Sequence, residues 1–207
     1  MDAMNHDRWL ALSERLGCPS LADHFQDLER AYADKRRAYH TARHIEECLS
    51  LFDSLRALCR SPDEVEFALW LHDDVCEPRH TDNEEKSADL ALQWLTRCGF
   101  DPEAAERVRG LIMATRHAGE PRSRDEELLT DIDLHVLGAS PERFDEYEAQ
   151  VRREYRWVPG PIFRRRRSEI LRGFLARDPL YRTEECRARF EEPARANLRR
   201  SLERLAG

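Results

Sequence analysis

Polar side chains that are costly to bury stand at the end of an apolar segment between Glu66 and Asp74. Five consecutive apolar residues, 67–71, lead directly into His72, Asp73 and Asp74. A run that is apolar on all sides belongs to a buried element. Burying a carboxylate costs free energy unless the group is paired, hydrogen-bonded or bound to a metal. The pattern therefore predicts a metal ion at the end of a core helix, with a capped, hydrogen-bonded helix end as the alternative.

A second candidate lies upstream, where His40 and His44 stand four residues apart. On a helix such a pair projects from the same face, one turn apart. His44 shares its face with Cys48 and Leu55, residues of the kind that face a core. We therefore expect His44 to point inward as a ligand, with His40 as an alternative ligand.

A third segment offers two carboxylates, Asp131 and Asp133. Asp133 lies on a helical stripe with Leu129, Ile132 and Val136, spaced like the buried face of a helix. Asp131 falls off that stripe. Periodicity thus predicts that Asp133 faces the core and binds the metal. Asp131 is expected to orient a ligand from behind, or to serve as an alternative ligand.

The predicted ligand set mixes nitrogen and oxygen donors: His44, His72, Asp73 and Asp133. Such a set suits a divalent transition metal (Mn²⁺, Fe²⁺, Co²⁺, Zn²⁺ or Ni²⁺, with Mg²⁺ as a further candidate) better than it suits Ca²⁺. The absence of thiolate ligands disfavours a structural zinc site. Four protein ligands leave positions for water and substrate on an octahedral metal, which lowers the pKa of bound water from ~15.7 towards ~7.

Helices must position these residues, because the apolar period is helical along the chain. We expect an all-α, single-domain helical bundle over residues 1–207, with roughly eight or nine helices. Proline at the first helical position predicts helix starts at Pro62, Pro102 and Pro141. Gly99 and Gly138 follow helical stretches and are predicted to adopt the left-handed conformation that ends a helix.

Composition narrows the class of protein. Charged residues make up 36% of the chain and hydrophobic residues 41%, with a net charge of −7. This balance argues for solubility and against general nucleic-acid or anionic-membrane binding. No apolar run approaches the ~18 residues of a membrane-spanning helix, and the N-terminus lacks a signal-peptide core, so we expect a cytoplasmic protein. The six cysteines show no C-x-x-C spacing and are predicted to be reduced thiols.

The order of the candidate ligands resembles a known signature. His44, then His72-Asp73, then Asp133 look like the H…HD…D motif of the HD-domain metal-dependent phosphohydrolase superfamily. Segments 39–45, 68–73, 83–88, 131–134 and 194–198 resemble a subgroup of small, stand-alone predicted hydrolases of that superfamily, and the similarity covers nearly the whole chain. The resemblance implies an all-α fold in which the four signature residues bind a metal.

Other polar residues near these segments are weaker candidates. Besides Asp73, the candidate catalytic groups are Glu84 and Glu85, one of which could act as general acid or base, although the pair could merely cap the next helix. The candidates for binding a substrate phosphate are Arg43, Lys86, Arg116 and His117. Pairing with nearby acidic residues is the alternative for the three basic side chains, and a polar helix end is the alternative for His117.

The expected function is hydrolysis of a small phosphate ester, with nucleotides among the candidate substrates by resemblance only. Two alternatives stay open. One is a catalytically silent module that senses a nucleotide on the same scaffold. The other is a di-iron oxygenase, which would need His40 and His117 as additional ligands.

Overall fold

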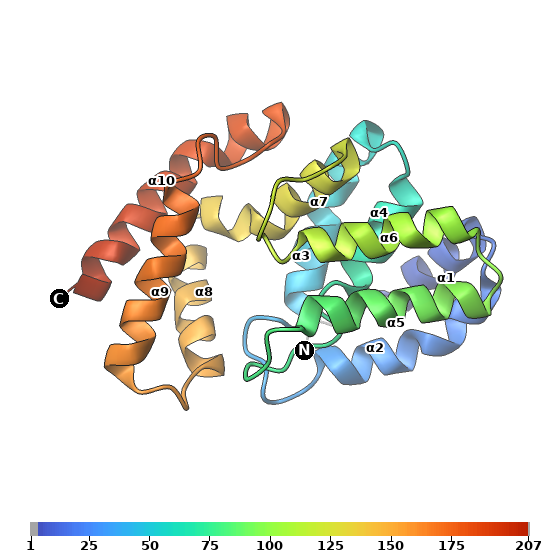
Figure 1. Cartoon of the computed structure of the whole chain (residues 1–207), viewed down its shortest axis with the longest axis horizontal. Coiled ribbons are helices and arrows are strands. Elements are labelled where there is room, and N and C mark those ends of the chain that lie inside the picture. The colour runs from blue at the N-terminus through green and yellow to red at the C-terminus, as the bar shows by residue number, and fades with distance from the viewer. Residues whose placement is uncertain (1–3, 207) are drawn as a thin grey trace. The chain divides into compact units, whose positions relative to one another are not determined.

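The structure, a computed structural model, describes residues 4–206. Across that range ten α-helices and three 3₁₀ helices follow one another with no strand between them (Figure 1). The predicted all-α class is confirmed, and the helix count is close to the prediction. The α-helices are α1 (His6–Arg15), α2 (Phe25–Tyr32), α3 (Ala42–Leu55), α4 (Pro62–Leu71), α5 (Asn83–Arg97), α6 (Pro102–Ala114), α7 (Arg124–Asp133), α8 (Pro141–Glu154), α9 (Gly160–Leu175) and α10 (Glu184–Ala206).

The chain divides into two compact units, Met1–Thr130 and Asp131–Gly207. The boundary falls within α7, which is one continuous helix. The first unit contains α1 to α6, and the second contains α8 to α10. That residues 1–207 form a single domain stays a prediction.

Helix α4 is enclosed in the first unit. All of its residues from Glu64 to Leu71 are buried, in agreement with its unbroken apolar run. The helix contacts α1, α3, α5 and α6, and α5 and α6 lie side by side in Figure 1. The Trp9 ring of α1 stacks on Phe67 at 5.7 Å and meets Trp70 edge-on at 5.5 Å. The end of α4 is therefore held inside the core of this unit.

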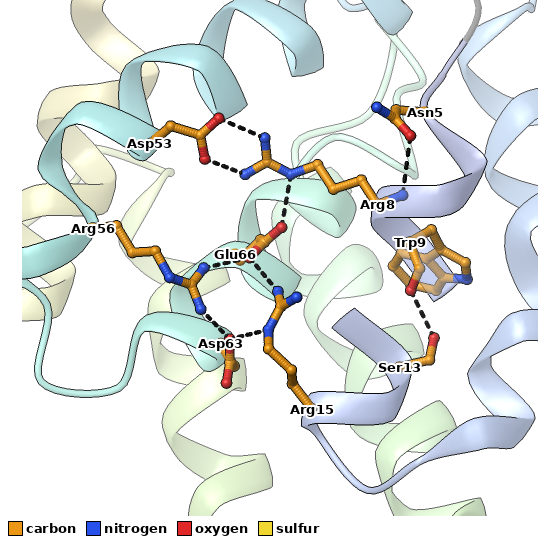
Figure 2. Close-up of polar contacts among 9 residues, drawn as sticks. All are labelled: Asn5, Arg8, Trp9, Ser13, Arg15, Asp53, Arg56, Asp63 and Glu66. Carbon is orange, nitrogen blue, oxygen red and sulfur yellow. Dashed lines mark hydrogen bonds and ion pairs between the residues drawn. The ribbon is translucent and has the colours of Figure 1, made fainter. Parts of the chain in front are cut away.

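A buried ion cluster around Glu66 fixes α4 against its neighbours (Figure 2). The Glu66 side chain is only 2% exposed. Its carboxylate accepts hydrogen bonds from Arg8 at 2.7 Å, Arg15 at 2.7 Å and Arg56 at 2.6 Å. Arg8 and Arg15 belong to α1, whereas Arg56 follows α3 directly. One carboxylate on α4 thus ties this helix to α1 and to the end of α3.

The predicted helix starts are confirmed at all three prolines. The side chains just before Pro102 and Pro141 cap their helices by accepting backbone hydrogen bonds. Gly99 has φ +74°, as predicted, but Gly138 does not adopt a positive φ, so that prediction is wrong. Close packing accounts for this glycine instead, because a Cβ added to Gly138 would lie 2.6 Å from the Cβ of Phe190.

Cys18 and Cys98 form a disulfide, with 5.5 Å between their Cα atoms. The prediction of six reduced thiols is therefore wrong at these two positions. The two cysteines lie 80 residues apart, one before the 3₁₀ helix Pro19–His24 and the other at the end of α5. Their spacing gives no sign of the proximity that the fold creates. The remaining cysteines, Cys48, Cys59, Cys76 and Cys186, are thiols.

The second unit is organised along α10. This helix contacts α9 and the 3₁₀ helix Leu134–Gly138, which in turn contacts α8. The buried Asn197 side chain donates to the carbonyl oxygens of Leu137 and Ala139, both at 2.9 Å, and so anchors the 3₁₀ helix to α10. Within residues 4–206, no helix is both long enough and apolar enough to cross a membrane.

Candidate metal centre

Two buried histidines meet in the first unit. His44 lies in the first turn of α3, and His72 directly follows the last residue of α4. Both residues are 1% exposed, and their Nε2 atoms are 3.2 Å apart. His44 faces inward because the stripe that it shares with Cys48 and Leu55 packs into the core, as the periodicity predicts.

The Asp73 carboxylate joins this pair. Its Oδ2 atom lies 3.1 Å from the Nε2 atom of His72 and 3.4 Å from the Nε2 atom of His44. The Asp73 side chain is 19% exposed, so the cluster is open to solvent on one side. Three donor atoms of the types that bind transition metals therefore converge within one unit.

The spacing of these donor atoms fits a metal ion. Bonds from a metal to imidazole nitrogen or carboxylate oxygen are ~2.0–2.2 Å long. With bonds of ~2.1 Å, neighbouring ligand atoms lie ~3.0 Å apart around an octahedral ion and ~3.4 Å apart around a tetrahedral one. The observed separations of 3.1 to 3.4 Å fall within that interval.

Hydrogen bonding fixes the orientation of the imidazoles. His72 Nδ1 lies 2.9 Å from the carbonyl oxygen of Leu69, which can only accept, so Nδ1 carries the proton. A neutral His72 ring then presents the Nε2 lone pair to the site. The His44 ring packs on Tyr39 with 4.7 Å between centroids, and its Nδ1 atom lies 3.7 Å from the Cys48 sulfur. Both rings are held in place before any ligand binds.

The two neighbouring carboxyl groups differ in charge behaviour. Burial opposes ionisation of Asp73, but the charges of His72 and His40, with hydrogen bonds from His44 and His72, hold its pKa well below the usual range. Burial raises the pKa of Asp74 to about 6, against the opposing charge of Arg37. Asp73 is therefore the member of the doublet that stays fully anionic near neutral pH, as a metal ligand must.

Asp133 is the last residue of α7 and is half-buried. It belongs to the second unit, whereas His44 and His72 belong to the first, so its role as a metal ligand stays a prediction.

Asp131 is held by the segment that precedes α10, and its expected role toward the metal stays a prediction. It is 1% exposed, although the stripe that contains Asp133 excludes it. Its two carboxylate oxygens accept hydrogen bonds from the backbone N–H groups of Arg182 and Thr183, at 2.8 and 2.7 Å, and from the Thr183 hydroxyl at 2.7 Å. Asp131 therefore holds the segment that leads into α10. The periodicity of one helix cannot reveal a partner some 50 residues away.

The N-terminus of α5 is tied to the turn that follows Asp73. The Ser87 hydroxyl accepts a hydrogen bond from the backbone N–H of Val75 at 3.0 Å. In the first turn of this helix Glu84 is half-buried, whereas Glu85 is exposed. Exposed Lys86 forms an ion pair with Asp82 at 2.9 Å. Among the three charged candidates on α5, Glu84 is the one that turns towards the protein interior.

The remaining candidates are the predicted phosphate-binding residues outside α5 and the alternative ligand His40. Arg43 Nε lies 3.1 Å from a Glu47 oxygen, one turn along α3. The ring centroids of His40 and His44 are 6.2 Å apart. Arg116 is exposed, and His117 is half-buried with a positive φ of 52°. The catalytic and substrate-binding roles of these residues stay predictions.

Sequence reasoning missed Arg37, which is 9% exposed. Its guanidinium donates to the carbonyl oxygen of Asp73 at 2.7 Å and to that of Asp74. The sequence has three successive basic residues at 35–37, just before His40, and that cluster is the only available signal. Nothing in it distinguishes exposed Arg36 from buried Arg37.

Comparisons with protein-family models, with curated proteins and with solved structures found no match to this chain. The function of the centre must therefore be inferred from the chemistry of its own residues.

Proposed function

We propose that this chain is a metal-dependent hydrolase of small phosphate esters, with nucleotides among the candidate substrates. The convergence of His44, His72 and Asp73 at 3.1 to 3.4 Å carries the proposal. With the proton on Nδ1, the neutral form of His72, which is the form that binds a metal, has its Nε2 lone pair facing the Asp73 oxygen. Two acceptors this close repel each other unless a cation, either a proton or a metal ion, lies between them. A divalent metal supplies such a cation.

The metal would be held by His44, His72 and Asp73, with Asp133 as the fourth ligand. A bound divalent ion supplies a water that ionises near neutral pH and a positive charge for the phosphoryl oxygens. The protein favours a cation here in two further ways. The low pKa of Asp73 keeps that ligand anionic. Two of the ligands, His72 and Asp73, also follow the C-terminal end of α4, where the helix dipole is negative.

The candidate side chains of the sequence would supply the other functions that the reaction needs. We assign Glu84 as the general acid or base, ahead of Glu85, because Glu84 is half-buried on a helix tied to the Asp73 turn. Arg43 and Arg116 have the forked donors that suit phosphate oxygens, with Lys86 and His117 as further candidates. The ligand order agrees with the H…HD…D signature that the sequence resembles.

Metal titration with a matched pair of variants tests the proposal. Protein purified without chelator would be titrated with Mn²⁺ and then incubated with phosphomonoesters, phosphodiesters and nucleotides while phosphate or alcohol release is followed. Wild type should bind Mn²⁺ and release product. Asp73→Ala should lose both properties, because it removes an anionic ligand. Asp74→Ala should retain the metal, because the Asp74 carboxyl group does not converge with His44 and His72.

Several outcomes would overturn the proposal. Wild type that binds no divalent transition metal would remove the centre itself. Metal binding without product release from any ester, but with tight nucleotide binding, would favour the sensor module. Two irons per chain with oxygen consumption would favour the oxygenase.

A further inference from the structure

Arg37 lies in the connection between α2 and α3, seven residues before His44. Its guanidinium reaches across to the residues that follow α4. Arg37 therefore joins the segment that carries one histidine ligand to the segment that carries the other. Both segments belong to the first unit, so the connection lies within one compact body.

The guanidinium makes a planar set of contacts. One terminal nitrogen donates to the Asp73 carbonyl at 2.7 Å and, over 3.4 Å, to the His40 carbonyl. The other terminal nitrogen donates to the carbonyl of Asp74. The central carbon of the guanidinium lies over the Tyr32 ring, 5.2 Å from the ring centroid. Arg37 thus bonds to the main chain on both sides of the centre.

Tyr32 extends these main-chain contacts to the last turn of α4. Its hydroxyl donates to the carbonyl oxygen of Trp70 at 2.8 Å, and the residue is 2% exposed. The last carbonyls of a helix have no partner within the helix, so external donors at this end decide where the chain goes next. Tyr32 and Arg37 together satisfy the oxygens of residues 70, 73 and 74. The path of the chain through His72 and Asp73 is fixed by these donors.

We propose that Arg37 is a positioning residue of the metal centre, which sets the Asp73 carboxylate against His44 by clamping the turn after α4. The inference rests on the proposed function. His44 Nε2 and Asp73 Oδ2, which lie 3.4 Å apart, belong to the two segments that the Arg37 guanidinium connects. The planar fork of arginine spans two successive carbonyls, whereas the single ammonium of lysine cannot hold both in the same way. The positive charge also favours this helix end.

The test compares Arg37→Lys with wild type, using Mn²⁺ titration followed by electron paramagnetic resonance and the visible absorption spectrum of bound Co²⁺. Arg37→Lys should weaken Mn²⁺ binding by ~10–100-fold, the usual effect of losing a group that orients a ligand. Its Co²⁺ spectrum should differ from that of wild type, because the ligand geometry changes. Arg37→Ala should show a loss at least as large. If that variant does not fold, Arg37→Lys alone decides.

Two control variants separate positioning from general stability. Arg36→Ala removes a neighbouring guanidinium that is 62% exposed and pairs with Asp34 and Glu77 but not with the carbonyls of Asp73 and Asp74, so this variant should bind Mn²⁺ like wild type. Glu66→Gln should destabilise the first unit without touching the turn after α4, so its folded form should also bind Mn²⁺ like wild type. If Glu66→Gln and Arg37→Lys weaken Mn²⁺ binding equally, the inference is overturned, because reduced stability of the first unit would then explain the loss of metal affinity in both variants.

The outcomes distinguish this inference from the proposed function. If wild type binds Mn²⁺ and Arg37→Lys binds it equally well with an unchanged Co²⁺ spectrum, Arg37 does not position the ligand and the centre stands. If wild type binds no metal, the proposed function is wrong and the role of Arg37 is lost with it.

Discussion

The substitution Glu66→Gln should destabilise the first unit severely while leaving its shape almost unchanged. The amide is nearly isosteric with the carboxylate, so the variant removes charge and little else. Three arginines would then surround a neutral group in a site where the side chain is only 2% exposed (Figure 2). Because these arginines come from α1 and from the end of α3, the loss should loosen α4 on both sides.

The loss of stability in Glu66→Gln depends on the acidic partners that each arginine retains. Arg8 retains a fork on Asp53, at 2.7 and 2.8 Å, and Arg15 and Arg56 both retain Asp63. Removing one partner of a buried ion pair costs ~3–5 kcal/mol, and the retained contacts place the cost near ~3 kcal/mol. For a chain of this size each kcal/mol lowers Tm by ~2–4 °C, so a fall of ~6–12 °C is expected.

Calorimetry and urea unfolding would measure the effect, with Asp53→Asn as the matched control. Asp53 is 57% exposed and contacts one of the same arginines, so its loss should cost only ~0.2–1 kcal/mol. Comparable small losses in both variants would refute the reasoning. That result would mean that the Glu66 cluster contributes no more than a surface ion pair.

Three further predictions concern other sites. Asp133→Asn should remove most Mn²⁺ affinity, and a titration that finds this variant equal to wild type would reverse the assignment. Asp131→Asn should keep the metal but lower the unfolding free energy by ~1–3 kcal/mol, because the buried donors at residues 182 and 183 lose their acceptor. Burial opposes ionisation of Asp63, but hydrogen bonds from two arginines lower its pKa, so its contribution to stability is present above the unfolded value of ~3.9 and is lost as pH falls below it. Asp63→Asn should therefore lose less stability than wild type during acid unfolding, and parallel curves would contradict this. Thiol titration of the unfolded chain should find four thiols without reductant, because Cys18 and Cys98 are bonded, and a count of six would exclude the disulfide.

Local sequence patterns predicted the features that depend on a single element. The unbroken apolar run of α4 predicted its burial, and proline predicted where helices begin. The stripe beside His44 predicted its inward direction, and His44 and His72 indeed meet at 3.2 Å. Each inference needed only the periodicity or the backbone chemistry of residues within a few turns of one another.

Features that depend on distant partners could not be read in the same way. Asp131 accepts hydrogen bonds from the segment at 182–183, and close packing against Phe190 leaves no room for a side chain at Gly138. The choice between Arg36 and Arg37 depends on where the turn after α4 lies. In each case the deciding contact joins residues whose proximity exists only in the folded chain.

The bond between Cys18 and Cys98 closes a ring of chain that contains α2, α3, α4 and α5. His44, His72 and Asp73 all lie inside this ring. In the chain-entropy model, a loop of 80 residues removes about 4.5 kcal/mol of freedom from the unfolded state. When the first unit unfolds, the ring keeps the three donors within a smaller volume than an open chain would. The redox state of one cysteine pair, remote from the donors, thus limits how far they separate on unfolding and shortens the search by which they find one another again.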